Sequence, residues 1–122
     1  MSVMQNEQLS DDMNRYYDQF MDVMKTLGEN SPEYTKSFGE FVKAGEKSGA
    51  LSSKFKELIS VALSVVTQCP YCVAYHVKNA VKEGATKQEI IESAMVAGVM
   101  GGGPAVAHIR LVIDACDQFG AK

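Results

Sequence analysis

Two cysteines and a histidine lie close together in the segment CPYCVAYH, at Cys69, Cys72 and His76. A residue that precedes a proline is pushed towards extended geometry, whereas proline itself fits the first turn of a helix. We therefore expect a helix to begin at Cys69. Unpaired backbone amides and the positive end of the helix macrodipole stabilise a thiolate there, and the thiolate is the reactive form of cysteine. The segment predicts a reactive dithiol.

His76 shares a helical face with both thiols. At about 100° per residue, Cys72 and His76 lie one turn apart, and Cys69 lies one turn earlier on the same face. An imidazole in this position can accept a thiol proton and return it later. We expect the three side chains to converge.

A carboxylate in the preceding helix is a further candidate. Glu57, Ser60, Ser64 and Gln68 recur at intervals of three and four residues and form a narrow polar stripe on an apolar helix. Either the stripe faces solvent, or Glu57 sits in a partly buried pocket that suits a carboxyl group to acid–base chemistry.

The distance from Glu57 to the thiols is a difficulty for this interpretation. Glu57 precedes Cys69 by twelve residues, which is about 18 Å along a continuous helix. Contact requires a bend near Gln68, a chain of bridging groups or a neighbouring subunit. Ser60 and Ser64 favour a water-filled path along the stripe.

The sequence predicts that helices alone position these residues. Apolar residues recur every three or four positions, and no alternation typical of strands competes. We expect a single all-α domain over residues 1–122, with N-terminal helices in 1–50 and a motif-bearing core in 52–119. About six helices are expected, over residues 11–27, 32–49, 52–68, 69–83, 86–100 and 105–119.

Local signals mark several ends of these helices. Ser31 precedes Pro32 at a helix start, and Thr86 with Glu89 has the spacing of a capping box. Gly28 is expected to close the first helix. The run GlyGlyGlyPro at 101–104 is expected to separate the last two helices.

Composition excludes several classes of function. The formal charge of −3 and the pI near 5.3 give no electrostatic footprint for nucleic acid. Lys and Arg are scattered, and no run approaches about 18 consecutive apolar residues, so we expect no membrane partner and no transmembrane helix. The polar start MSVMQNEQLSDDM does not resemble a signal peptide. We therefore expect a cytoplasmic protein, in which a CxxC pair points to redox chemistry or metal.

Three of the expected helices are too apolar for a monomer of 122 residues to bury easily. They are the segments 52–68, 86–100 and 105–119. Self-association would cover this surface. We expect a homo-oligomer.

The pattern Glu57-x11-Cys69-x2-Cys72-x3-His76 resembles the signature of AhpD-like alkylhydroperoxidases, in the carboxymuconolactone decarboxylase superfamily. The similarity extends over roughly residues 52–119. The resemblance implies an AhpD-like helical bundle that assembles as a homo-trimer or homo-hexamer. It also implies an enzyme that reduces organic hydroperoxides without a cofactor or metal.

The resemblance also implies roles for the residues. Cys72 attacks the peroxide and becomes a sulfenic acid, Cys69 resolves it to a disulfide, and Glu57 and His76 relay protons. A dithiol donor, either lipoyl-bearing or thioredoxin-like, then restores the pair. Local electrostatics favour Cys69 as the more acidic thiol, but His76 lies one turn from Cys72, so we follow the resemblance.

Tyr71 departs from the best-known peroxidase branch, which has a histidine immediately before the second cysteine. A tyrosine can donate a hydrogen bond but cannot shuttle protons near pH 7. A disulfide is therefore an alternative substrate. Lactone-acting decarboxylases of the superfamily do not need a CxxC pair, so the pair counts against that activity.

Two further interpretations remain open. Zinc could bind Cys69, Cys72 and His76 with His108 or Glu57, although structural zinc sites do not usually place three ligands on one short helical segment. Alternatively, the chain is a non-enzymatic helical oligomer or ligand-binding protein with a vestigial CxxC site. His108 either lines the site from the last helix or is a core histidine. Cys116, on an apolar helix, is expected to be a buried structural thiol.

Overall fold

The computed structural model describes residues 10–122, and this part of the chain is helical with no strand. The all-α fold class is therefore confirmed. The proposed domain begins at residue 1, and residues 1–9 lie outside the described part. The helices are α2 (Met13–Asn30), α3 (Pro32–Glu46), α4 (Ser53–Val66), α5 (Pro70–Lys82) and α6 (Lys87–Gln118).

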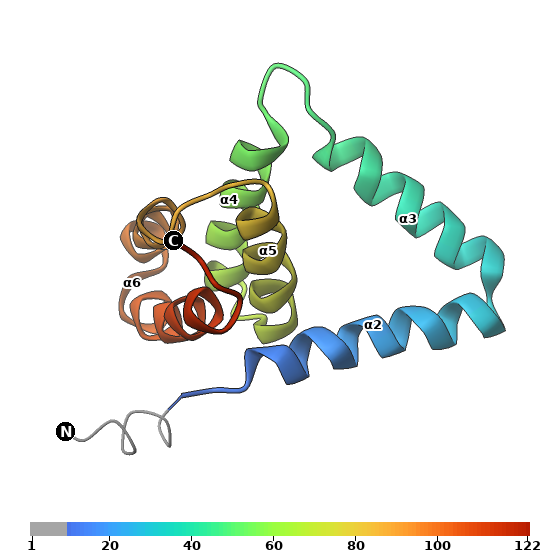
Figure 1. Ribbon diagram of the computed structural model, residues 1–122, viewed down its shortest axis with the longest axis horizontal. Coiled ribbons are helices and arrows are strands. Elements are labelled where there is room, and N and C mark those ends of the chain that lie inside the picture. The colour runs from blue at the N-terminus through green and yellow to red at the C-terminus, as the bar shows by residue number, and fades with distance from the viewer. Residues whose placement is uncertain (1–9) are drawn as a thin grey trace.

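Helices α4, α5 and α6 pack against one another and form the body of the molecule, while α2 and α3 form an arm (Figure 1). Helix α2 starts against α5 and α6 and runs away from them, and α3 returns towards the start of α4. The core is built mainly from small and β-branched side chains, so the helices of the body approach closely. Its fully buried members include Val61, Val65, Val73, Val77 and Val112.

The chain reverses direction between α4 and α5. Gln68 has a φ of 57°, in the left-handed region, and the backbone N–H of Cys69 donates to the carbonyl of Ser64 at 3.1 Å. Cys69 is the N-cap of α5 and Pro70 is its first residue, as expected. The two helices therefore pack side by side, and the bend near Gln68 that Glu57 required is present.

Helix α6 has a kink at the expected break. Gly102 has φ 69° and ψ −156°, which only glycine adopts readily, and Pro104 follows it. The predicted break at 101–104 is therefore confirmed, because α6 consists of two helical segments that meet at this kink.

Two other helix ends differ from expectation. Gly28 does not close α2, which continues to Asn30, where the Ser31 N–H donates to the Leu27 carbonyl at 2.7 Å. Helix α3 ends at Glu46 and not near Gly49, because Lys47 takes up extended geometry. The capping box of Thr86 and Glu89 is confirmed.

Two polar side chains of α6 fix the beginning of the arm. The carboxylate of Asp114 accepts a hydrogen bond from the backbone N–H of Asp11 at 2.9 Å, and Gln118 accepts one from Met13 at 2.7 Å. Asp114 is buried and also pairs with Arg110. These contacts fix where α2 leaves the body.

Helix α6 is more apolar than the sequence analysis indicated, which considered only runs of consecutive apolar residues. By length and composition alone, this helix is suited to crossing a membrane, with an 18-residue window of mean hydropathy 1.4 of which 17% is buried. Val99 and Met100 are 83% and 81% exposed. Helix α4 adds exposed apolar residues at Phe55, Ile59, Leu63 and Val66. The chain thus carries a large uncovered apolar surface, as expected.

Candidate active site

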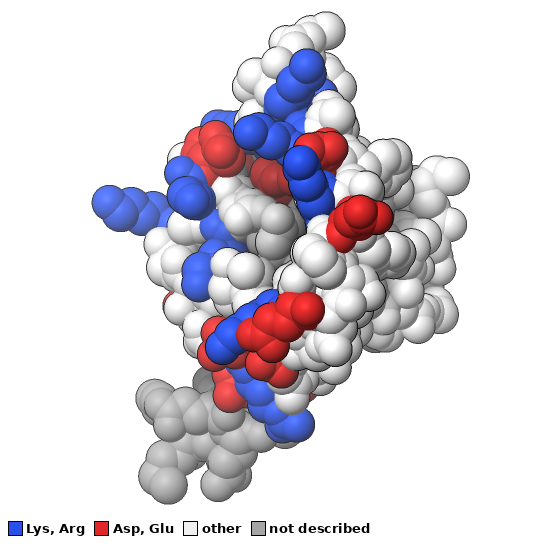
Figure 2. Space-filling view, turned by 90° about the vertical axis from the view of Figure 1, so that its right-hand side faces the viewer, with Lys and Arg blue, Asp and Glu red and all other residues white. Residues whose placement is uncertain are grey.

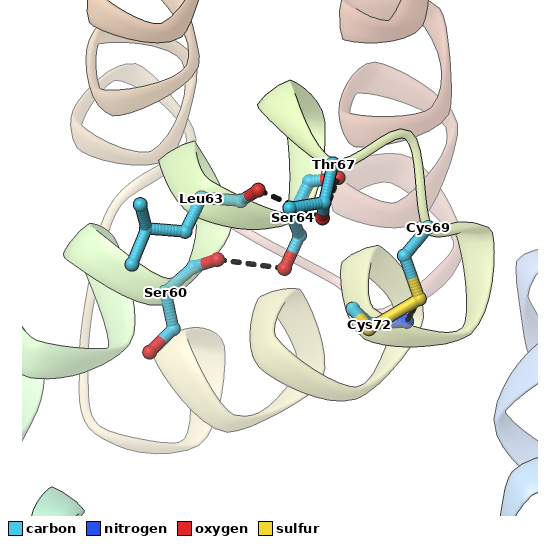
Figure 3. The surroundings of a disulfide bond; sticks show 6 residues. All are labelled: Ser60, Leu63, Ser64, Thr67, Cys69 and Cys72. Carbon is cyan, nitrogen blue, oxygen red and sulfur yellow. Dashed lines mark hydrogen bonds between the residues drawn. A yellow bond between two sulfur atoms is a disulfide. The ribbon is translucent and has the colours of Figure 1, made fainter.

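Cys69 and Cys72 form a disulfide at the start of α5 (Figure 3). Their Cα atoms are 5.2 Å apart, and the backbone N–H of Cys72 donates to Sγ of Cys69 at 3.1 Å. The Cys-x-x-Cys spacing at the start of the helix brings the two sulfur atoms within bonding distance. The pair can therefore alternate between a dithiol and a disulfide.

Glu57 and His76 meet across the α4–α5 pair. Nδ1 of His76 lies 2.8 Å from Oε2 of Glu57, so the imidazole N–H donates to the carboxylate. Glu57 is only 5% exposed, which excludes the interpretation that the polar stripe simply faces solvent. The reversal at Gln68 makes this contact possible between residues that are 19 apart in sequence.

Glu46 is a third member of this cluster that the sequence did not indicate. It is the last residue of α3, and its Oε1 lies 3.7 Å from Nδ1 of His76. Partial burial raises the pKa of the Glu46 carboxyl, and the negative charge of Glu57 raises this pKa further. A charged residue near a helix end is common on surfaces, so nothing in its spacing distinguished Glu46.

The hydroxyl groups of Ser60 and Ser64 are engaged within α4. Ser60 donates to the carbonyl of Lys56 at 2.9 Å, and Ser64 donates to the carbonyl of Ser60 at 2.6 Å. Figure 3 shows Ser64 between Ser60 and the disulfide. Neither serine lines the cavity beside the cysteines. The predicted water path along this stripe is untested.

A cavity of about 740 Å³ opens between the arm and the body, beside Cys72. Figure 2 looks onto the side of the molecule where α2 turns into α3, on which basic and acidic side chains surround a hollow. Glu46, Glu57 and His76 lie in its wall together with Cys72, whereas Cys69 does not. Most of the remaining lining is apolar or aromatic, and includes Phe20, Met21, Met24, Phe38, Val42 and Tyr75.

Tyr71 lies between this cavity and a second hollow of about 750 Å³. Its ring meets the ring of Tyr16 edge to face, with the ring centroids 5.3 Å apart. Its hydroxyl donates a hydrogen bond to the side-chain oxygen of Gln19 at 3.3 Å. Both contacts tie the first turn of α5 to α2. The second hollow is lined by Cys69 as well as Cys72.

The structure does not bring His108 to this site. Its Nδ1 lies 3.0 Å from the carbonyl oxygen of Pro104 in its own helix, and neither hollow includes it. Of the zinc ligands that the sequence offered, His76 and Glu57 meet, but both cysteine sulfurs are engaged in the disulfide. Among the described residues, the group with the geometry to hold a metal ion is Glu46, Glu57 and His76, whose ligand-type atoms lie within 4.8 Å of one another.

Cys116 differs from the other two cysteines in its bonding and in its burial. It is a free thiol on α6 and is fully buried. Burial raises the pKa of this thiol to about 11. The expectation of a buried structural thiol is confirmed.

The model of the carboxymuconolactone decarboxylase family matches residues 32–115. The chain belongs to this family. Two curated relatives are uncharacterised. Protein 4 of the cox locus of Paracoccus denitrificans is 46% identical over 71 residues, which is 58% of this chain and 64% of the relative. A protein of Cupriavidus necator is 33% identical over 95 residues, or 78% of this chain and 84% of the relative. The chain thus spans slightly less than two thirds of the Paracoccus relative.

Solved structures of the same family have this fold. A family member from Legionella pneumophila superposes with a TM-score of 0.86 at 34% identity, over 90% of this chain and 98% of that one. A member from Thermotoga maritima, for which a part in an antioxidative response has been suggested, gives a TM-score of 0.76 at 27% identity. That match covers 87% of this chain and 90% of that one.

Proposed function

We propose that this member of the carboxymuconolactone decarboxylase family is a thiol-dependent oxidoreductase that reduces organic hydroperoxides. One observation carries the proposal. A Cys-x-x-Cys disulfide at a helix N-terminus shares a cavity wall, through Cys72, with the buried Glu57–His76 pair. A dithiol needs a proton acceptor to form the thiolate and a proton donor for the leaving oxygen, and a carboxylate–imidazole pair serves as both.

The reaction begins with the thiolate of Cys72, whose proton His76 has accepted. Sγ attacks the terminal oxygen of R–O–O–H, the O–O bond breaks, and a sulfenic acid and an alkoxide form. The alkoxide takes the proton from His76 and leaves as an alcohol. The thiolate of Cys69 then attacks Sγ of Cys72, the hydroxide leaves as water with the proton of the Cys69 thiol, and the disulfide results.

The cavity supports an organic substrate. Its wall is largely apolar and aromatic and reaches Cys72, so the alkyl group of a hydroperoxide can be buried beside the attacking sulfur. Hydrogen peroxide would gain nothing from such a lining. A small organic disulfide fits the same cavity and would undergo exchange at the same thiol.

A dithiol donor, lipoyl-bearing or thioredoxin-like, completes the cycle by reducing the disulfide with two electrons. We further propose that the protein acts in the cytoplasm, where such donors are kept reduced, and that it assembles as a homo-trimer or homo-hexamer. The uncovered apolar residues of α4 and α6 support the assembly.

Stopped-flow mixing of the reduced protein with cumene hydroperoxide tests the peroxidase activity. The wild-type chain should consume one equivalent rapidly and form the Cys69–Cys72 bond. The Cys72→Ser variant should lose the rapid phase entirely. Cys69→Ser should react once and stop at a sulfenic acid, which dimedone traps.

Cys116→Ser is the matched control, because Cys116 is buried in α6 and lies in the wall of neither hollow. It should react at the wild-type rate. Equal rates for the wild-type chain and Cys72→Ser would contradict the proposed function.

A further inference from the structure

Glu46 lies outside the Glu57-x11-Cys69-x2-Cys72-x3-His76 pattern, on the helix before it, yet the fold brings it to the same imidazole. We propose that Glu46 is a third member of the carboxylate–imidazole relay, a positioning residue that acts on His76 together with Glu57. The proposal deepens the proposed function, because it concerns the proton acceptor of the same dithiol.

The geometry that carries the proposal is the convergence of three helices on one nitrogen. Glu57 from α4 and Glu46 from α3 both face Nδ1 of His76 from α5, at 2.8 Å and 3.7 Å. All three groups lie in the wall of the cavity that reaches Cys72. The hydrogen bond to Glu57 holds the ring proton on Nδ1, and the carboxylate of Glu46 at 3.7 Å adds a second negative charge beside it. Nε2 is then the nitrogen left free to take a thiol proton.

The backbone at Glu46 is held in place by the start of α4. The hydroxyl of Ser53 donates to the carbonyl of Glu46 at 3.3 Å, and the ammonium of Lys56 donates to the carbonyl of Lys47 at 2.7 Å. Ser53 precedes Glu57 by four residues, one helical turn. The same face of α4 thus holds the main chain of Glu46 and meets its side chain.

The pKa of Glu46 differs from that of a solvent-exposed glutamate. The last residue of a helix faces the negative end of the macrodipole, where a carboxylate is unfavourable. Burial and the charge of Glu57 act in the same direction and raise the pKa of Glu46, while His76 partly offsets them. Glu46 therefore changes charge at a higher pH than a solvent-exposed glutamate does. Below that pH it is neutral, and above it a second negative charge faces His76.

Other ionisable groups also face this cluster. From α5 these include Tyr75, whose pKa is raised chiefly by burial and also by Glu46 and Glu57. Helix α2 contributes only apolar side chains to the cavity wall. The remaining ionisable groups of the wall, besides the three cluster residues and Cys72, are Tyr71 and Lys82 on α5, Glu83 directly after it, Lys43 on α3 and Lys47 directly after that helix.

The test measures the rate at which iodoacetamide alkylates Cys72 in the reduced protein, as a function of pH, for the wild-type chain and Glu46→Gln. Glutamine mimics the neutral form of Glu46, so the two profiles should coincide at acid pH. They should separate as Glu46 ionises, with Glu46→Gln slower by about three- to tenfold near pH 7.5, a small part of what general base catalysis contributes. Ser53→Ala should shift the profile in the same direction, because it releases the main chain of Glu46.

Glu40→Gln is the matched control, because Glu40 is exposed on the same helix and does not line the cavity. Its profile should equal that of the wild-type chain.

A pH profile of Glu46→Gln that equals that of the wild type, or alkylation that is slower by the same factor at every pH, would overturn the proposal. So would a wild-type profile that a chelator converts into that of Glu46→Gln, because the cluster would then act through a bound metal ion. Alkylation does not require a peroxide, so a separation of the profiles in a protein that fails to reduce cumene hydroperoxide would support the role of Glu46 and contradict only the peroxidase activity.

Discussion

The three cysteines of this chain occupy two chemically different environments. Cys69 and Cys72 sit at a helix N-terminus beside open hollows, where helix geometry favours the thiolate. Cys116 is surrounded by the core and has no such stabilisation. Reactivity is therefore set by position in the fold, since the side chains are identical.

This difference predicts how the reduced protein is alkylated. The pKa of Cys116 is raised to about 11 by burial, so its thiol stays protonated well below that pH. At pH 8 about one Cys116 side chain in a thousand carries the thiolate. Native protein treated with iodoacetamide should therefore gain two labels by intact mass spectrometry, and a third only after denaturation. Rapid labelling of all three in the native protein would show that Cys116 is accessible.

The four motif residues could be predicted from the sequence, and Glu46 could not. Cys69, Cys72 and His76 lie within one helical segment, so their relation follows from helix geometry alone. The contact between Glu57 and His76 requires only that the chain reverse near Gln68. The position of Glu46 beside His76 depends on the path of residues 47–52, which connect α3 to α4 without regular structure. No local sequence pattern determines that path.

At the scale of elements, local chemistry determines most helix starts. Ser52 accepts from the N–H of Phe55, Thr86 forms its capping box with Glu89, and Cys69 takes the N-cap position. Each of these signals acts within four residues, so the sequence was sufficient to predict them. The end of α2 was predicted wrongly because Gly28 can remain inside a helix when neighbouring groups satisfy the backbone. The end of α3 was predicted wrongly because Lys47 takes up extended geometry before Gly49 is reached.

The kink of α6 provides a prediction with an internal control. Gly102 has a backbone conformation that side chains strongly disfavour, so Gly102→Ala should destabilise the protein by about 1–3 kcal/mol. Gly45 is an exposed residue of α3, and a methyl group there would meet nothing within 4 Å. Gly45→Ala should therefore be neutral or stabilising by up to about 1 kcal/mol. Urea denaturation followed by circular dichroism measures both, and equal stability of the two variants would contradict the role of Gly102.

At the scale of the whole molecule, the exposed apolar side chains of α4 and α6 require an explanation. Val99 and Met100 are among the most exposed residues of α6, and Phe55, Ile59, Leu63 and Val66 follow one another at helical spacing on α4. A protein surface of this kind marks an interface with another chain or with a membrane. A membrane is the weaker explanation, because Gly102 interrupts α6 and because α4 and α5 pack along it.

Light scattering after size-exclusion chromatography in buffer without detergent distinguishes the two explanations. If α6 forms the interface between copies, the wild-type chain should elute with three or six times its mass of 13.3 kDa. Val99→Asp places an unpaired charge within that interface, where desolvation is costly, and should yield smaller assemblies or single chains. Gln88→Asp, an equally small change at an exposed polar position of the same helix, should leave the mass unchanged. A wild-type protein that elutes as a single chain, or that stays in solution only with detergent, would contradict the proposed assembly.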